Sequence, residues 1–97
     1  HPKILIEAMS CGMIVLASNV DGNNQIVHDN INGFLCEPNH RSIEKKINDI
    51  LEMDNAKLNQ IRASARDHIL NQFSLEKVVK MELDLYQNIF ANKKNYY

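Results

Sequence analysis

Glu7 is the side chain in this sequence whose setting most invites a chemical role. It lies in the segment His1–Gly12, and an ionised carboxylate offers only hydrogen-bond acceptors, which suits a ligand that carries donors. Helical spacing alone favours a simpler interpretation, because Glu7 lies away from the Leu5–Met9 apolar stripe and one helical turn after Lys3. That position predicts a solvated helix residue in a weak ion pair.

The cysteines and histidines indicate neither a metal site nor a nucleophile. Cys11 and Cys36 are too few and too far apart for a disulfide framework or a Cys-x-x-Cys motif, which favours reduced thiols. No histidine lies at a spacing that would activate Cys11, so we expect a small buried residue there. His28, His40 and His68 have no metal-ligand spacing and are predicted to be surface or helix-end residues.

Composition excludes two further classes of function. The 97 residues include 11 Lys and Arg against 12 Asp and Glu, for a net charge of −1. Nucleic-acid binding needs a clustered positive excess, whereas Lys45–Lys46 and Lys93–Lys94 are isolated pairs. No apolar run approaches the roughly 20 residues of a membrane span.

The first part of the chain alternates helix and strand. Pro2, helically spaced apolar residues and a stop at Gly12 predict a short helix over His1–Cys11. Met13–Ala17 is apolar without alternation, which is typical of a parallel strand covered on both faces. Ser18–Gln25 is polar and is predicted to be a loop. A turn and a second strand are expected at His28–Gly33 and Phe34–Cys36.

The remainder of the chain is predicted to be helical, with Ser74 as the N-cap of the last helix and residues 92–97 as a polar tail. Apolar residues at helical spacing define three faces that we expect to be buried. These are Ile43, Ile47, Ile50 and Leu51, then Leu58, Ile61, Ala65 and Ile69, and finally Leu75, Val78, Val79, Leu85, Tyr86 and Ile89.

This order of elements predicts an α/β fold with helices packed on a parallel sheet. Two short strands make a poor sheet, and the sequence does not open with Met, so we expect a fragment whose other strands lie upstream of His1. Open parallel sheets bind ligands beyond the carboxyl ends of their strands, so geometry directs attention to the loop after Ala17.

Residues 1–18, HPKILIEAMSCGMIVLAS, resemble the signature of the retaining GT-B glycosyltransferases of family 4, Leu-Glu-Ala-Met-Ala-x-Gly-x-Pro-Val-Ile-Ala after a Glu-Gly opening. The resemblance continues through VDGNNQIV at 20–27 and NGFL at 32–35, and then through the Ala-Arg, Phe-Ser-Leu-Glu and Leu-Tyr pattern of the last helices. It implies that residues 1–91 are the C-terminal part of a nucleotide-sugar-binding domain with a partial Rossmann-like sheet, followed by the tail 92–97.

The same resemblance assigns a donor site. Two glutamates of the family hold the donor, and Glu7 matches the second, which accepts hydrogen bonds from the ribose hydroxyls of the nucleotide. A carboxylate can accept from both vicinal hydroxyls in charge-assisted bonds. Met9 and Ser10 would line the nucleotide side. The partner glutamate would lie just before His1, and the basic pair that neutralises the diphosphate would lie further upstream.

Departures from the family pattern bear on the loop. Gln25 stands where a Glu is usual, so this position can accept a hydrogen bond but brings no charge. Asp21-Gly22 replaces the common Gly-Gly, and Met13-Ile14 stands where a residue followed by Pro is usual. The polar segment Asn19–Asn24 also fits a plain turn.

By resemblance, the intact protein would transfer a hexose from a UDP- or GDP-linked sugar to a hydroxyl acceptor with retention of configuration, without a metal cofactor. This chain would contribute ribose binding and would be inactive alone. The family's acceptors imply a cytoplasmic enzyme at the inner membrane face. The alternatives are a degenerate, non-catalytic module whose last helix meets the N-terminal domain or another partner, and, more distantly, a nucleotide-sugar 2-epimerase.

Overall fold

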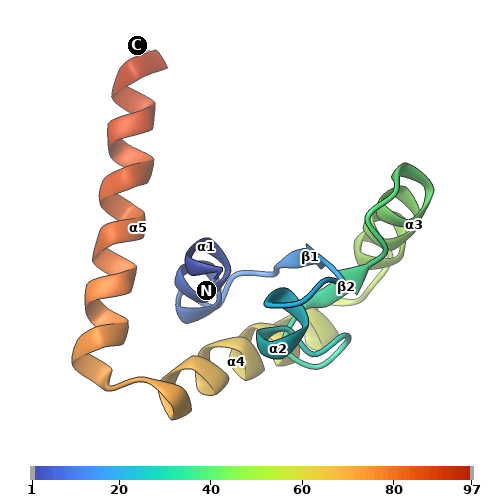
Figure 1. The fold of residues 1–97 in the computed structure, drawn as a ribbon, viewed down its shortest axis with the longest axis horizontal. Coiled ribbons are helices and arrows are strands. Elements are labelled where there is room, and N and C mark those ends of the chain that lie inside the picture. Colours follow the sequence, from blue (N-terminus) through green and yellow to red (C-terminus); the bar gives the residue numbers. More distant parts are fainter. Residues whose placement is uncertain (1, 97) are drawn as a thin grey trace.

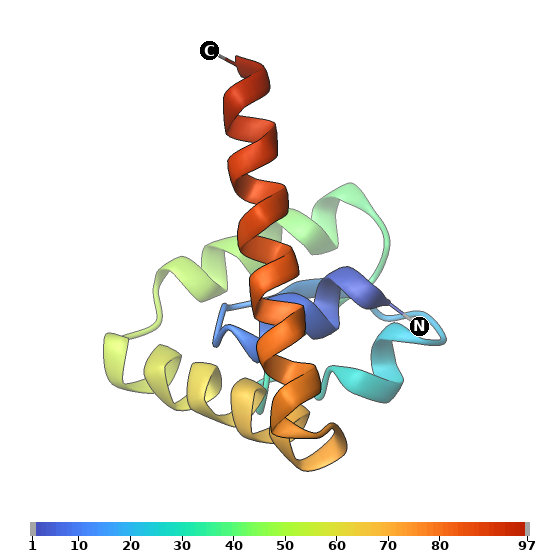
Figure 2. The same ribbon diagram turned by 90° about the vertical axis from the view of Figure 1, so that its left-hand side faces the viewer.

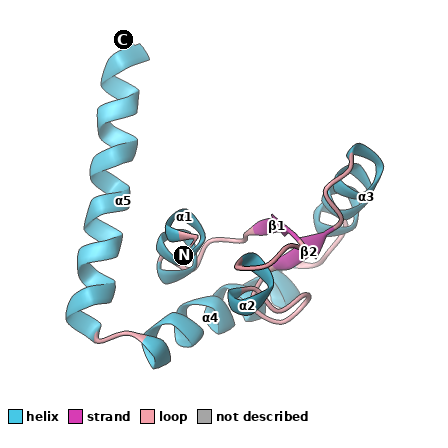
Figure 3. Cartoon of the chain, viewed as in Figure 1, coloured by secondary structure: helices cyan, strands magenta, loops and turns pink. Residues whose placement is uncertain are grey.

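The computed structural model describes the backbone of residues 2–96 and the side chains of residues 2–91, so His1 and Tyr97 lie outside the described residues. A small two-stranded sheet lies among the helices, and the last helix stands apart from it (Figure 1, Figure 3). In chain order the elements are α1 (Lys3–Ser10), β1 (Leu16–Ser18), α2 (Asn23–Ile26), β2 (Phe34–Cys36), α3 (His40–Leu51), α4 (Asn55–Gln72) and α5 (Leu75–Tyr96).

The sheet is parallel, as predicted, which confirms the α/β fold class. Leu16 pairs with Phe34 and Ser18 pairs with Cys36. The second strand has its predicted bounds. The first is shorter than predicted and begins later, because β2 offers only three residues for pairing, although the Val15 carbonyl still accepts a hydrogen bond from the Phe34 N–H at 2.9 Å.

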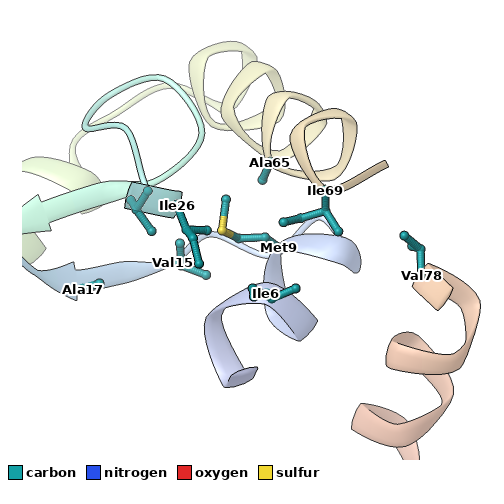
Figure 4. Packing of buried hydrophobic residues seen from close by; sticks show 9 residues of the cluster. Ile6, Met9, Val15, Ala17, Ile26, Ala65, Ile69 and Val78 are labelled. Atoms are coloured by element: carbon teal, nitrogen blue, oxygen red, sulfur yellow. The ribbon is translucent and has the colours of Figure 1, made fainter. Parts of the chain in front are cut away.

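The hydrophobic core lies between α1, α4 and the segment that contains β1 and α2 (Figure 4). The stripe predicted on α4 is confirmed, since Ile61, Ala65 and Ile69 are all buried. Other buried apolar members come from the first 27 residues and from α5. They are Ile6, Met9, Val15, Ala17, Ile26, Val27 and Val78.

The predicted buried faces of α3 and α5 are largely wrong. No residue of α3 is buried, and Leu51 is 76% exposed. On α5, Val78 is fully enclosed, but Leu75, Val79, Tyr86 and Ile89 are exposed. Figures 1 and 2 show that only the first half of α5 lies against α1 and that the rest extends away from the other elements, which accounts for Tyr86 and Ile89 but not for Leu75 and Val79 in the first half. Periodicity identified the apolar faces but not what covers them.

Among the predictions from local sequence, the N-cap of the last helix is confirmed. Ser74 caps α5, because its Oγ accepts a hydrogen bond from the Lys77 N–H at 3.2 Å. The backbone of α5 runs past the boundary predicted after residue 91, up to Tyr96. The segment predicted to be a loop after β1 contains the short helix α2, which begins after Gly22 at a φ of 93°.

The turn before β2 is held by a buried side chain. Asn32 accepts a hydrogen bond from the His28 N–H at 2.7 Å and donates to the Ile26 carbonyl at 3.1 Å. Asn30, with a φ of 65°, takes the left-handed conformation that this turn requires. The helices of the described residues include none that is both long and apolar enough to cross a membrane.

Candidate functional site

Glu7 is almost fully enclosed, which overturns the interpretation of a solvated helix residue. Only 3% of the surface of Glu7 is exposed, and its Oε1 has no hydrogen-bond partner among the described residues. The Nζ of Lys3, one turn earlier on α1, lies 3.7 Å from that oxygen, too far for a hydrogen bond. A buried acceptor without a donor is costly, so Glu7 marks a place where a ligand could supply one.

Glu7 lines a cavity of about 320 Å³ between α1 and α5. The lining residues come from α1, from α5 and from Phe73 just before α5. Figure 2 shows α5 passing in front of α1. One part of the lining is apolar and consists of Ile6, Phe73 and Met81. The other part is charged, with three ammonium groups and two carboxylates, from Lys3, Lys77, Lys80, Glu7 and Asp84.

The sequence did not reveal the α5 side of this cavity. Lys77, Lys80 and Asp84 lie some seventy residues or more from Glu7 along the chain and carry no motif of their own. The spacing of Lys77, Lys80 and Asp84 does place them on one face of α5, and Phe73 lies just before that helix. Only the packing of α5 against α1 makes that face a wall of the cavity.

Met9 and Ser10 are enclosed differently from Glu7. Met9 has no exposed surface and belongs to the hydrophobic core, while the Ser10 Oγ donates to the Glu7 carbonyl at 2.7 Å. In this conformation neither side chain faces the cavity, so Met9 packs the core and Ser10 holds the end of α1. Their predicted contact with a nucleotide stays a prediction.

Gln25 does not share the cavity of Glu7. It is exposed on α2 and borders a separate hollow with Pro2, Gly22 and Gln72. The Asn23 side chain donates to the Ser18 carbonyl at 3.1 Å and so ties α2 to the carboxyl end of β1. The segment after β1 therefore lies at the strand end where open parallel sheets bind ligands. At least one of its polar side chains, Asn23, stabilises the fold of the segment itself.

The thiols show no sign of activation. Burial raises the pKa of the Cys11 thiol, which disfavours the thiolate, and Cys36 is buried in β2. No group of three or more metal-ligating side chains lies together among the described residues.

His68 departs from the predicted surface position. Its ring meets that of His28 edge to face at 5.5 Å between centroids, and its Nε2 is enclosed without a partner among the described residues. Burial, and then the charge that His28 can carry, lower the pKa of His68. His40, at the start of α3, is exposed as predicted.

Comparison with known proteins shows what the chain is similar to. Residues 2–68 match the family model described as "Glycosyl transferases group 1". The chain is 36% identical over 93 residues to an Escherichia coli UDP-Gal:alpha-D-GlcNAc-diphosphoundecaprenol alpha-1,3-galactosyltransferase, covering 95% of this chain and 24% of that protein.

Two solved structures share the fold. The crystal structure of Anabaena HepE in complex with UDP and glucose has a TM-score of 0.69 and 26% identity, covering 93% of this chain and 24% of that one. A glycosyltransferase from Rickettsia africae has a TM-score of 0.64 and 30% identity, covering 92% and 24%. The chain thus spans about a quarter of the length of the proteins it matches.

Proposed function

Because this chain belongs to the glycosyl transferases group 1 family, which has the GT-B fold, we propose that it forms part of a donor-binding domain and holds the ribose of a nucleotide sugar through Glu7. The whole protein would transfer a hexose from a nucleotide diphosphate sugar to a hydroxyl acceptor, with retention of configuration. The proposed donor site uses no metal ion.

The observation that carries this proposal is the enclosed Oε1 of Glu7. A carboxylate oxygen that is removed from water and lacks a hydrogen-bond donor is unfavourable in the unliganded chain. A ribose presents two adjacent hydroxyl donors, and it would satisfy this oxygen in charge-assisted hydrogen bonds. The adjoining cavity of about 320 Å³ lies within the size range of small-molecule sites.

Uracil is the base we propose for the nucleotide. The name of the similar galactosyltransferase includes UDP-Gal, and the similar Anabaena structure holds UDP and glucose. Transfer of the sugar depends on stabilising charge on the departing diphosphate and on positioning the acceptor. We assign those tasks largely to parts of the family beyond the quarter that this chain matches, so the chain alone would bind donor without turning it over.

The acceptor we propose is a lipid-linked or surface-polysaccharide precursor, which would bring the whole enzyme to the inner face of the membrane. The diphosphoundecaprenol in the name of the Escherichia coli relative supports this class of acceptor.

Calorimetric titration with UDP and GDP tests the donor role. We expect UDP to bind more tightly than GDP, and the Glu7→Gln substitution to weaken UDP binding about tenfold or more, because two charge-assisted hydrogen bonds lose their charge. Glu44→Gln, on the exposed face of α3, is the matched control and should bind as the parent does. Unchanged UDP affinity in Glu7→Gln would show that Glu7 does not bind the nucleotide.

One observation favours a second function, that of a non-catalytic interaction module. Exposed apolar residues form a continuous stripe along α5, namely Leu75, Val79, Leu83, Tyr86 and Phe90. Such a stripe is a typical protein-binding surface. If no nucleotide binds and the Leu83→Lys substitution abolishes association with the remainder of the protein or with a partner, this second function is the better description.

A further inference from the structure

The turn that precedes β2 contains the one Asn-Gly pair of the sequence, Asn32–Gly33. We propose that Asn32 is a deamidation site that the native fold keeps closed, and that its modification turns transient unfolding of this chain into permanent loss of the fold. The inference is independent of the proposed function, because it uses neither Glu7 nor the cavity beside it.

The reaction requires the chain itself and water. The backbone nitrogen of Gly33 attacks the side-chain amide carbon of Asn32, and the new C–N bond closes a cyclic imide. The bond from that carbon to Nδ2 breaks, and the nitrogen leaves as ammonia with the proton that the Gly33 N–H loses. Water then opens the imide at either of its two C–N bonds, so the product is aspartate or isoaspartate. Glycine favours the attack because it has no side chain to shield its nitrogen and leaves the backbone free to turn.

Two hydrogen bonds oppose this reaction in the folded chain. The Oδ1 of Asn32 accepts from the His28 N–H at 2.7 Å, and its Nδ2 donates to the Ile26 carbonyl at 3.1 Å. Closing the imide removes Nδ2 and reorients Oδ1, so both hydrogen bonds are lost. Asn32 is only 2% exposed, so water cannot replace them, and the buried partners would be left unsatisfied.

The backbone of Gly33 is fixed as well. Gly33 forms a β-bridge with Asp29, and its carbonyl accepts a hydrogen bond from the Asn30 N–H at 2.9 Å. A Cβ added to Gly33 would lie 2.7 Å from the Val15 Cγ2, which shows how closely the core packs against this residue. The peptide between Asn32 and Gly33 can therefore rotate into the geometry of attack only when the turn and the core around Val15 come apart.

Neither product fits the closed turn. An aspartate at position 32 could still accept from the His28 N–H, but once ionised it has no donor for the Ile26 carbonyl. Two acceptors would then face each other, with a charge that water does not reach. An isoaspartate adds one carbon to the backbone and shifts Gly33 from a position that has no spare room. A chain modified while unfolded therefore does not regain the native turn.

The rate of modification should follow the population of unfolded chains, because a slow reaction of the open state reports the unfolding equilibrium. A core substitution far from the turn raises that population and leaves Asn32 unchanged. Val78 is fully enclosed and lies on α5, which stands apart from β2 in Figure 1. Val79→Ala is the matched control for Val78→Ala, since Val79 is the same residue type on the same helix but is 43% exposed.

The experiment follows the Asn32 peptide over time. The parent, Val78→Ala and Val79→Ala are incubated at mildly alkaline pH, with and without denaturing guanidinium chloride, and the digested peptide is measured by mass spectrometry. In denaturant we expect all three to be modified at one rate. Without denaturant the parent should be modified about tenfold more slowly or less, and Val78→Ala should be modified about fivefold faster than Val79→Ala.

A second measurement tests the effect of the product. Asn32→Asp reproduces one deamidated form, and we expect it to lower the denaturant midpoint clearly or to prevent folding. Asn48→Asp, on the exposed surface of α3, makes the same chemical change and should leave the midpoint unaltered.

Three results would overturn the proposal. Equal rates for the parent with and without denaturant would show that the fold does not protect Asn32. Equal rates for Val78→Ala and Val79→Ala without denaturant would show that Asn32 reacts through local opening and not through unfolding. An unaltered midpoint in Asn32→Asp would show that the modified chain folds normally, so that deamidation does not trap the unfolded state.

Discussion

The Nζ of Lys3 lies 3.7 Å from the Oε1 of Glu7, yet the Lys3 side chain is 77% exposed and the Glu7 side chain only 4% exposed. The two groups are one turn apart on the same short helix, so their spacing in the sequence does not predict that they differ in exposure. Because the Glu7 side chain is enclosed and that of Lys3 is not, the carboxylate loses hydration that the ammonium keeps, and the ion pair offsets little of that loss.

The first prediction concerns the stability of the unliganded protein. Glu7→Met replaces an enclosed carboxylate, whose Oε1 has no hydrogen-bond donor among the described residues, with an apolar side chain of similar length, and we expect it to raise the free energy of unfolding by about 1 kcal/mol at neutral pH. Urea denaturation measures this change, and Glu44→Met on exposed α3 is the control. A destabilised Glu7→Met variant would mean that the carboxylate has a stabilising partner within the chain.

Asp84 gives a prediction about the charge in the cavity. It lines the same cavity as Lys77 and Lys80, so its charge should oppose a bound diphosphate. We expect Asp84→Asn to strengthen UDP binding several-fold and to leave uridine binding unchanged, since about 1 kcal/mol corresponds to roughly fivefold. Weaker UDP binding in this variant, measured by calorimetry, would show that Asp84 instead supports the site.

The contrast between α3 and α4 predicts different costs for similar truncations. Ile69→Ala removes a fully enclosed side chain from the core and should destabilise the protein by about 2–4 kcal/mol. Leu51→Ala truncates a side chain that is 76% exposed and should cost less than about 0.5 kcal/mol. Thermal denaturation of both variants checks this, and comparable losses would indicate that α3 is covered in solution.

Gly33 should not tolerate a side chain. A Cβ at this position would lie 2.7 Å from the Val15 Cγ2 and 3.0 Å from the Val27 Cγ1, and both valines are buried. We expect Gly33→Ala to destabilise the protein by about 1–3 kcal/mol, because β-branched side chains in a packed core cannot easily move aside. The free energy of unfolding should fall less in a Gly33→Ala/Val15→Ala double variant than the sum of the two single losses, since the second substitution relieves the clash.

His68 gives a pH dependence. Its pKa is lowered, first by burial and then by the charge on His28, so the folded protein favours the neutral ring. The unfolded chain binds the proton more readily, so the stabilising contribution is fully present above pH 6.5 and is lost as the pH falls toward the lowered pKa. Urea midpoints at pH 7.5 and pH 5 measure this loss, which we expect to be smaller in His68→Gln.

His28→Asn is the companion variant for the pH experiment. It removes the neighbouring charge but leaves His68 in place, so the pKa of His68 should be lowered less, and the loss of stability at pH 5 should fall between those of the parent and His68→Gln. An unaltered difference between pH 7.5 and pH 5 in both variants would assign the acid sensitivity to other groups.

Much of the local structure follows from the sequence by itself. Uniformly apolar segments predicted two parallel strands, the stripe that includes Ile61, Ala65 and Ile69 predicted the buried face of α4, and Ser74 predicted a helix cap. The Glu-Ala-Met segment around Glu7 indicated the family. These features depend on neighbours a few residues away, and short-range spacing records them.

What covers each face was decided only by the tertiary structure. The apolar stripes of α3 and of the far half of α5 look in sequence like that of α4, yet they are exposed because no other described element packs over them. Glu7 looks like a solvated residue until α5 crosses α1 and encloses it. The lysines of α5 become part of the candidate site by the same packing, which joins segments that helical periodicity cannot relate.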